Sequence, residues 1–383
     1  MRRRRIVHIV YSFSVGGLEN VIVQLINRLP ADRFEHVLLS LTDISEFKDR
    51  IAQPGVRFIE LHKSPGHAVP LYPKIYKLLR ELKPDIVHTC NLAALELVPL
   101  AWLARVPLRV HAEHGWDKHD PDGSNPRYQR LRKLYKPFVS RYVAVSQDLY
   151  EYLARTIRVP ASKLSLIANG VDTVQFHPPA GARQAVSGCP FDPAYHLLVG
   201  TVGRLQTVKN QPLLARAFVL LLQQHPELAD RARLVIVGEG PLREEVESVL
   251  SGAGLMHLAW LPGARGDVAD VLRMFTVFVL PSQTEGTSCT LQEAMATGLP
   301  AVATAVGGNP ALLGDDLGQL TPAGDVVAMA VALFERLTDA TASQLQGAKA
   351  RQRACEHFGI ERLATQYESL FVGAPAGAPN GRT

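Results

Sequence analysis

Two glutamates flank a short run of small residues in the segment PSQTEGTSCTLQEAMATGLP (281–300). Glu285 and Glu293 stand on either side of Gly286-Thr287-Ser288. The apolar run VFVLPS before this loop is typical of a buried strand, and CTLQEAMATG after it has the composition of a helix. The loop is therefore predicted to open a helix, whose free N–H groups and partial positive charge would suit a phosphate group.

The two carboxylates would then lie on opposite sides of that phosphate. Glu293, more than one turn inside the helix, can accept two hydrogen bonds from a vicinal diol such as a ribose, while Glu285 projects from the loop. This arrangement predicts a nucleotide-sugar site with one carboxylate for each sugar. The alternative is that Glu293 is an exposed helix residue and that Glu285 is an acid favoured by the helix dipole.

Two cations follow another predicted strand. In GTVGRLQTVKN (200–210) the strand ends at Gly203, and Arg204 and Lys209 lie on the connection to the next helix. Because the carboxyl ends of parallel strands face the crevice in which open α/β sheets bind ligands, these cations would neutralise a diphosphate there. In the alternative interpretation, Arg204 pairs with a carboxylate and Lys209 is a solvated lysine at a helix start.

Glycines mark two further strand ends. VIVGEGP (235–241) contains Gly238 and Gly240, but Arg243 stands where the dinucleotide fingerprint G-x-G-x-x-G needs its third glycine, so a nicotinamide-dependent enzyme is disfavoured. The turn would let a nucleobase approach the backbone, or serve only as a tight turn. After the first strand, Gly16-Gly17 permits a phosphate to approach the start of the next helix.

A histidine-rich segment, HAEHGWDKHD (111–120), ends another predicted strand. It carries His111, His114 and His119 among three carboxylates, and histidine and carboxylate are suitable metal ligands. However, the side chains alternate between strand faces and nothing repeats at helical i, i+4 spacing, so we expect neither a metal nor another cofactor. His114 is expected to touch a substrate hydroxyl or phosphate in a cleft.

A basic amphipathic segment, NPRYQRLRKLYKPFVSRY, covers residues 125–142. Such a helix can lie on an anionic membrane surface, and the alternative is a helix with a solvated basic face. Nucleic acid is disfavoured as a partner because no nucleic-acid-binding signature accompanies the charge. The predicted membrane or acceptor surface comprises Arg127, Arg130, Arg132, Lys133 and Lys136.

The elements that must position these residues form two series in which short apolar runs alternate with helix-length segments. This alternation is typical of parallel sheets with helices on both faces, and 383 residues suit two domains. The pattern breaks in a stretch rich in Pro, Gly and Ala at 176–196. We therefore predict a first domain over 1–180, a second over 190–358 with a cleft between them, and a disordered tail over 373–383.

Charge and composition limit the class of protein. Residues 1–180 hold 26 Lys and Arg against 17 Asp and Glu (+9), and the remainder hold 15 against 19 (−4), which gives the net charge of +5. The basic first half favours an anionic partner. Because no apolar run suits a membrane span, no signal cleavage site is evident and the four cysteines are scattered, we expect a cytoplasmic protein that can be peripheral at the inner face of the membrane.

Taken together, these residues resemble glycosyltransferase family 4, which contains retaining enzymes of the GT-B fold. The resemblance covers nearly the whole chain in the order of the family's motifs. The matching positions are Gly16-Gly17 with Glu19, His114, AVS at 144–146, NGVD at 169–172, Gly203-Arg204 with Lys209, GEGP at 238–241, Glu285 with Glu293, and Gly307-Gly308 with Pro310.

The resemblance implies an architecture and a donor site. Two Rossmann-like domains would face each other across a cleft, and a last helix, 359–372, would cross back onto the first domain. Arg204 and Lys209 would hold the donor diphosphate, together with backbone amides after Glu285 and near Gly17. Glu293 would bind the ribose.

The resemblance also implies a mechanism without a metal. Glu285 would lie near the hydroxyls of the donor sugar, and His114 would contact the transferred sugar or assist its departure. The acceptor hydroxyl would attack on the side from which the nucleotide diphosphate leaves, so that the anomeric configuration is retained. Cations and amides would stabilise the departing diphosphate.

The predicted function is that of a retaining transferase of a hexose or hexosamine from a nucleotide diphosphate sugar, UDP in preference to GDP, to a glycan or lipid-linked acceptor. EHGWDKHDPDG (113–123) also resembles sugar transferases of bacterial exopolysaccharide clusters. Ala311 departs from the glutamate that the family often has after Gly-Gly-x-Pro. Two alternatives stay open: a nucleotide-sugar epimerase or hydrolase of the same architecture, and a non-catalytic nucleotide-sugar-binding partner subunit.

Overall fold

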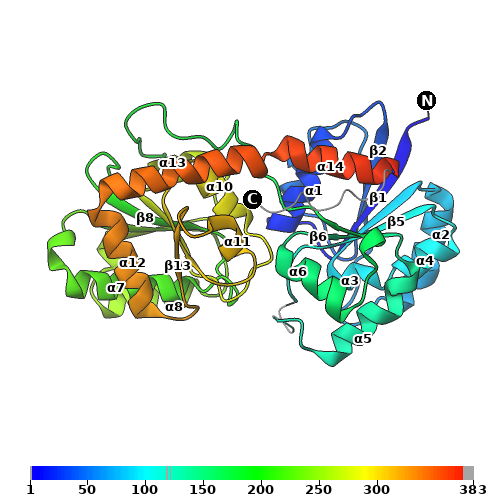
Figure 1. Cartoon of the computed structure of the whole chain (residues 1–383), viewed down its shortest axis with the longest axis horizontal. Helices are drawn as coiled ribbons and strands as arrows, with labels where there is room; N and C mark the ends of the chain where they lie inside the picture. The colour runs from blue at the N-terminus through cyan, green and yellow to red at the C-terminus, as the bar shows by residue number, and fades with distance from the viewer. Residues whose placement is uncertain (1, 118–119, 121, 374–383) are drawn as a thin grey trace. The chain divides into compact units, whose positions relative to one another are not determined.

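The computed structural model describes residues 2–117, 120 and 122–373. The chain folds into two compact units: unit 1 contains the residues up to Asn169 and those from Ile360, and unit 2 is Gly170–Gly359. Each unit is built on a parallel sheet with helices packed against it (Figure 1). No helix in the described ranges is both long enough and apolar enough to cross a bilayer. His119 and the predicted disordered tail, apart from Gly373, lie outside the described residues.

Unit 1 contains a seven-stranded sheet in the order β3-β2-β1-β4-β5-β6-β7. All its pairings are parallel, and its central strands are almost wholly buried, as their continuous apolar runs predict. The strands are β1 (Arg4–Val10), β2 (Phe34–Ser40), β3 (Arg57–Glu60), β4 (Ile86–Cys90), β5 (Leu108–Glu113), β6 (Arg141–Ala144) and β7 (Leu164–Leu166).

Helices cover both faces of this sheet. Ile75 and Leu79 pack in one core cluster with Val7 of β1, whereas Ile22 packs in another with Val10, and Val7 and Val10 point to opposite faces of their strand. The helices of unit 1 are α1 (Gly17–Arg28), α2 (Tyr72–Leu82), α3 (Asn91–Leu95), α4 (Val98–Leu103), α5 (Pro126–Tyr135), α6 (Gln147–Glu151) and α14 (Ile360–Val372).

The last helix, α14, belongs to unit 1 and packs against α1. Arg28 of α1 forms an ion pair with Glu361 at 3.1 Å. On the buried side of α14, the rings of Tyr367 and Phe371 lie 5.5 and 5.8 Å from that of His88, measured between ring centroids. The apolar face of this helix therefore has its partner surface on the first sheet.

Unit 2 repeats the arrangement with a six-stranded parallel sheet in the order β10-β9-β8-β11-β12-β13. Its strands are β8 (Leu197–Val202), β9 (Ala232–Val237), β10 (Ala259–Gly263), β11 (Val277–Leu280), β12 (Ala301–Thr304) and β13 (Gln319–Thr321). Its helices are α7 (Gln211–Gln224), α8 (Arg243–Gly252), α9 (Val268–Met274), α10 (Cys289–Ala296), α11 (Asn309–Leu313), α12 (Val326–Thr338) and α13 (Ala340–His357).

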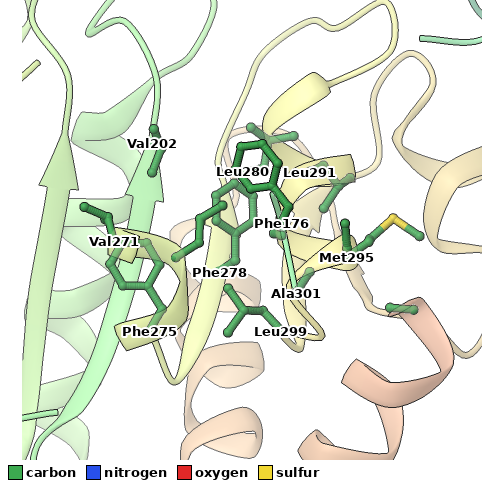
Figure 2. Close-up of a cluster of buried hydrophobic side chains, with 14 of the residues drawn as sticks. Phe176, Val202, Val271, Phe275, Phe278, Leu280, Leu291, Met295, Leu299 and Ala301 are labelled. Atoms are coloured by element: carbon green, nitrogen blue, oxygen red, sulfur yellow. The ribbon is translucent and has the colours of Figure 1, made fainter. Parts of the chain in front are cut away.

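The Pro-, Gly- and Ala-rich stretch at 176–196 is irregular, but it is packed onto unit 2. Phe176 and Phe191 are buried in the same core cluster as β11 and α10, and Figure 2 shows Phe176 among those side chains. Val171 N–H donates to the carbonyl of Phe358 at 2.8 Å. Residues 170–180, which the sequence assigned to the first domain, therefore belong to the second, because apolar anchors and backbone hydrogen bonds hold them there.

Candidate functional site

Strand order reverses at one place in each sheet, between β1 and β4 in unit 1 and between β8 and β11 in unit 2. In open α/β sheets, ligands bind beyond the carboxyl ends of the strands at such a switch point. In unit 2, the loop after β8 carries Arg204 and Lys209, and the loop after β11 carries Glu285. The topology therefore brings together two motifs that are some 80 residues apart in the sequence.

An ion pair joins these two loops. Lys209 Nζ lies 2.6 Å from Glu285 Oε1, and Ser282 Oγ donates to the same oxygen at 2.6 Å. The carboxylate side chain is 8% exposed and the lysine side chain 26% exposed, so the lysine lies nearer to solvent. Arg204 is exposed.

The helix that the sequence predicts after this loop begins at Cys289, with Ser288 as its N-cap. Ser288 Oγ accepts a hydrogen bond from Leu291 N–H at 3.3 Å, which satisfies one of the free amides of the first turn. Gly286 and Thr287 precede the cap and are buried. Figure 2 shows Leu291 and Met295 among the buried side chains of the cluster, which also contains Leu280 of β11 and Ala301 of β12. Apolar packing thus fixes the direction of α10.

Glu293 lies in the fifth position of α10 and is half-buried. Its carbonyl accepts hydrogen bonds from Thr297 N–H at 2.9 Å and Thr297 Oγ1 at 2.8 Å. The helix therefore continues without distortion through this residue, and the carboxylate is carried by a packed, regular element.

The loop after β12 packs against the backbone of Glu285 and Gly286. Gly307 has φ +51°, and a Cβ at this position would lie 1.8 Å from the carbonyl oxygen of Glu285. Gly308 N–H donates to the carbonyl of Gly286 at 2.8 Å. The Gly307-Gly308 motif is thus explained by close backbone packing against the glutamate loop, and only glycine allows this approach.

Gly238 and Gly240 serve the arginine loop in a similar way. Their φ angles are +140° and +153°, and a Cβ on either would lie 1.9 Å from the carbonyl oxygen of Gly203 or 2.3 Å from that of Leu205. Leu205 N–H donates to the carbonyl of Glu239 at 2.9 Å. The two glycines therefore let the loop after β9 hold the loop that carries Arg204.

In unit 1, Gly16 and Gly17 lie at the switch point between β1 and β4. The helix α1 begins at Gly17, with Gly16 as its N-cap. The Glu19 side chain reaches back over this turn, because a Cβ on Gly16 would lie 2.1 Å from Glu19 Oε2. Asn20 N–H donates to the carbonyl of Gly16 at 2.9 Å. An acidic side chain thus covers the amide end of this helix.

His114 directly follows β5. Its backbone N–H donates to Asn91 Oδ1 at 2.7 Å, and Asn91 directly follows β4 in a left-handed conformation with φ +59°. Burial lowers the pKa of His114 to about 4; the Glu113 carboxylate opposes this shift and His111 adds to it. The imidazole is therefore neutral at pH 7 and can exchange a hydrogen bond with a hydroxyl without carrying charge.

The histidines that the sequence considered together take different partners. His111 pairs with Thr89 Oγ1 through Nδ1 at 2.9 Å, and its Nε2 faces Glu113 at 3.4 Å. His114 instead groups with His88 and Cys90 of β4, and their ligand atoms all lie within 4.8 Å of one another. Sequence analysis missed this group because two of its members come from a different strand.

The prediction that Arg132 belongs to an exposed basic surface is wrong. Its side chain is 4% exposed and pairs with Glu113, Nε to Oε1 at 2.6 Å and Nη2 to Oε2 at 3.3 Å. Lys136 is half-buried and donates to the carbonyls of Ile157 and Arg158, both at 3.0 Å. Arg127, Arg130 and Lys133 are exposed.

The Glu113 carboxylate is stabilised in its charged form. Burial by itself would raise its pKa, but the neighbouring Arg132 guanidinium, with a further contribution from His111, lowers it to about 2. The Arg132 guanidinium also lies over the Tyr152 ring, with 5.5 Å between Cζ and the centroid. Since this pair joins α5 to the end of β5, it fixes the strand end from which His114 departs.

Two family models match the chain. The model for Glycosyltransferase Family 4 matches residues 15–175, and the model for Glycosyl transferases group 1 matches residues 196–339. Together they cover both motif-bearing units.

Similar proteins extend along nearly the whole chain. N-acetyl-alpha-D-glucosaminyl L-malate synthase from Bacillus anthracis is 30% identical over 381 residues, 96% of this chain and 97% of the relative. UDP-Gal:alpha-D-GlcNAc-diphosphoundecaprenol alpha-1,3-galactosyltransferase from Escherichia coli is 27% identical over 383 residues, 96% of each protein. The crystal structure of Anabaena HepE in complex with UDP and glucose matches with a TM-score of 0.80 at 21% identity, over 96% of this chain and 99% of that one. From these matches and the two doubly wound units, the chain belongs to glycosyltransferase family 4 and is a glycosyltransferase of the GT-B fold.

Proposed function

We propose that this glycosyltransferase moves a hexose or hexosamine from a UDP-sugar to a lipid-linked acceptor or glycan, with retention of configuration and without a metal. The observation that carries the proposal is the pairing of Lys209 with Glu285 at the switch point of unit 2, beside the first turn of α10. A cation, a carboxylate and a helix N-terminus are gathered there at the ends of two strands, which suits a ligand with anionic phosphates and a neutral, hydroxyl-rich sugar.

In the proposed donor site, the diphosphate lies between the exposed Arg204 and the half-exposed Lys209, and its oxygens accept hydrogen bonds from amides at Gly286 to Ser288. Glu293 accepts the two ribose hydroxyls. The preference for uridine is supported by the name of the galactosyltransferase relative, which specifies UDP-Gal as its donor, and by HepE, which was crystallised with UDP.

The transfer step requires no covalent bond to the protein. The bond from the anomeric carbon to the β-phosphate oxygen breaks, the acceptor oxygen forms a bond on the same face, and a phosphate oxygen takes the acceptor proton. Glu285 suits a stabilising role rather than a nucleophilic one, because Ser282 Oγ donates to its Oε1 and the side chain is almost wholly buried. The neutral His114 is proposed to exchange a hydrogen bond with the transferred sugar.

The acceptor is proposed to be presented at an anionic membrane, in the assembly of an exopolysaccharide or another surface glycan. Trp102 and Leu103 of α4 are 51% and 53% exposed, and Leu134 of α5 is 62% exposed. Arg130 and Lys133, on the same helix as Leu134, are exposed as well. Exposed apolar side chains with neighbouring cations are typical of proteins that rest on a membrane surface, and the galactosyltransferase relative is named for a diphosphoundecaprenol-linked acceptor.

The test is a ligand-binding panel in the presence of a chelator. UDP, GDP, ADP and NAD are added to the protein and to a Lys209→Met variant, and thermal unfolding is followed. A ligand at about 100 times its Kd stabilises the folded state by roughly 2.7 kcal/mol. We expect UDP to raise the midpoint in the parent and to lose this effect in the variant; a shift with NAD alone, or one that survives the Lys209 change, would contradict the donor site.

Product analysis then tests the reaction itself. UDP-sugars that stabilise the protein are supplied with an acceptor, and the anomeric coupling constant of the product is measured by NMR. A product with the donor's configuration supports the proposal. Inversion would refute the retaining mechanism, and release of free sugar at the full rate without acceptor, or conversion of the donor into its epimer, would identify a hydrolase or an epimerase instead.

A further inference from the structure

His88, Cys90 and His114 of unit 1 form a compact group of metal-ligating side chains. The first two are on β4, two residues apart, and therefore share one face of the strand. His88 Nε2 lies 3.8 Å from Cys90 Sγ, and the ligand atoms of all three residues lie within 4.8 Å of one another. A tetrahedral Zn²⁺, bound at roughly 2.0–2.1 Å by nitrogen and 2.3 Å by sulfur, separates such ligand atoms by about 3.5 Å.

The backbone holds the third ligand close to the first two. Cys90 pairs with Ala112 in the register of β4 and β5, so the ends of both strands are level. The His114 N–H bonds to Asn91, the residue after Cys90, at 2.7 Å. Both ring nitrogens of His114 are shielded from solvent, and within the described residues the neighbouring hydrogen-bonding side chain is that of Asn169, which favours the charged form of the ring. The three ligand atoms, at most 4.8 Å apart, are thus little farther from one another than in a tetrahedral zinc site.

Two further histidines support the group from behind. His88 Nδ1 lies 3.1 Å from His8 Nδ1, and His8 Nε2 lies 3.0 Å from His36 Nδ1. In the tautomers in which each ring donates to the next, from His88 to His8 to His36, His88 Nε2 carries its lone pair toward Cys90. A hydrogen bond from the second ring nitrogen of a histidine ligand is how proteins fix ligand orientation and tautomer.

We propose that His88, Cys90 and His114 bind a thiophilic divalent cation, Zn²⁺ being the best match, and that its binding withholds His114 from sugar transfer. One thiolate and two imidazoles are ligands that zinc prefers and that Mg²⁺ and Ca²⁺ do not. On binding, the sulfur–proton bond of Cys90 is replaced by a sulfur–zinc bond, the proton passes to solvent, and water fills the fourth position.

This cation is an inhibitor and not a cofactor. A coordinated His114 ring has one nitrogen occupied by the metal and can no longer exchange a hydrogen bond with a sugar. The inhibitory part of the proposal rests on the role proposed above for His114, whereas the binding part rests only on the geometry of the three ligands. The two parts therefore need separate readouts.

The binding part is tested by titration with Co²⁺, which reports a thiolate ligand through a charge-transfer band and a tetrahedral site through intense visible bands. The parent is expected to develop both at one equivalent and to lose them when Zn²⁺ is added. Cys90→Ser should lose the charge-transfer band, and Cys355→Ser, at an exposed cysteine of unit 2, should keep it. A parent without these bands, or a Cys90→Ser protein that keeps them, overturns the site.

Folding of the variants is checked by their thermal transitions. If Cys90→Ser does not fold, His88→Gln replaces it, and the parent titration alone can still overturn the proposal. The inhibitory part is tested by measuring transfer against free Zn²⁺: we expect a loss of roughly tenfold or more in the parent, reversed by EDTA, and little loss in Cys90→Ser. Equal inhibition of both proteins refutes this part. If the parent transfers no sugar at all, the proposed function fails while the cobalt titration still decides the metal site.

Discussion

Two ion pairs of nearly equal length differ in what surrounds them. Glu113 with Arg132 and Glu285 with Lys209 both have a carboxylate at or just beyond the carboxyl end of a parallel strand, and in both the nitrogen lies 2.6 Å from the oxygen. Both partners of the first pair are almost wholly buried, with side-chain exposures of 4% and 1%. In the second pair the lysine is 26% exposed.

This difference separates a structural pair from an exchangeable one. A buried charge that loses its partner is strongly destabilising, so unit 1 loses much of its stability when Arg132 and Glu113 are separated. A lysine with access to water can leave its carboxylate when a better anion arrives, and the diphosphate of the proposed donor would be such an anion. The same two charge types therefore serve as a fixed joint in unit 1 and as a ligand-responsive contact in unit 2.

The largest expected effect comes from breaking the buried pair. Arg132→Ala leaves Glu113 without its cation and should lower the free energy of unfolding of unit 1 by about 3–5 kcal/mol. Urea unfolding is followed by tryptophan fluorescence in a Trp260→Phe background, in which the remaining tryptophans, Trp102 and Trp116, both report on unit 1.

The matched control is Arg130→Ala, two residues away on the same helix but exposed. Its free energy of unfolding should stay within about 0.5 kcal/mol of the parent. If the two variants unfold alike, the distinction between a fixed and an exchangeable pair is lost.

The next effect concerns the exchangeable pair of Glu285 and Lys209. Removing the Glu285 charge should lower the rate of transfer but raise the affinity for UDP. Glu285→Gln should lower the rate of transfer by about 10²–10³, equivalent to roughly 2.7–4 kcal/mol, because it removes charge stabilisation from the transition state. The same change frees Lys209 from its carboxylate and should tighten the binding of UDP by roughly two- to fivefold, since a partly exposed ion pair is worth less than about 1 kcal/mol. Calorimetry measures the affinity for UDP, and a transfer assay measures the rate.

Asp316→Asn is the control for this prediction. Asp316 forms an exposed ion pair with Lys349 at 2.7 Å in the same unit, away from the switch-point loops. Neither UDP binding nor transfer should change in this variant. Weaker UDP binding by Glu285→Gln would mean that the carboxylate organises the phosphate site instead of competing for it.

The third prediction extends the comparison of the two units to histidine. Burial lowers the pKa of His36 in unit 1 to about 4, whereas the histidines of unit 2 are exposed or half-buried. The unfolded chain binds the proton near pH 6.5 and the folded chain only near pH 4, so stability is lost as the pH falls through this window. Each pH unit is worth about 1.36 kcal/mol for such a group, or about 2 kcal/mol between pH 7 and pH 5.

His36→Gln should flatten the pH dependence of unit 1 by that amount, measured by urea unfolding at pH 7 and pH 5 in the Trp260→Phe background. His257→Gln, at an exposed histidine of unit 2, is the control and should leave the slope of unit 1 unchanged. Glu113 does not interfere, since its carboxyl stays ionised throughout this window. An unchanged slope in His36→Gln would show that the pH dependence arises elsewhere.

The fold could be predicted from the sequence because its signals are local. The alternation of apolar runs with helix-length segments predicted the two parallel sheets, and the helix predicted after the glutamate loop begins at Cys289 as expected. The motif residues were also correctly placed after strand ends. The partner of a residue across the fold has no such signal. Arg132 looks like its neighbours Arg130 and Lys133 in the sequence. Only the packing of α5 against the end of β5 shows that it is buried beside Glu113.

Sequence analysis missed the hydrogen-bonded histidines of unit 1 for the same reason. His36, His8 and His88 come from three strands. The register places His8 opposite His88 and places His36 opposite Ile6, two residues before His8, and sequence spacing does not reveal this register. The stretch at 176–196 has the composition of a linker, yet Phe176 and Phe191 anchor it in a core. Composition predicted its irregular backbone but not its packing.

The smallest expected effect concerns the exposed cations near Arg132. These side chains can reach an anionic membrane surface, which the buried Arg132 cannot. Lys133→Gln should weaken association with vesicles of anionic lipid by about fivefold, because one basic residue near such a surface contributes about 1 kcal/mol. Arg216→Gln, at an exposed arginine of unit 2, should leave association unchanged, and raised salt should weaken the parent toward the variant. If co-sedimentation does not depend on the charge of the lipid, the exposed basic residues of α5 serve only to keep the protein solvated. The charge difference between the two units would then affect solubility and not the location of the enzyme.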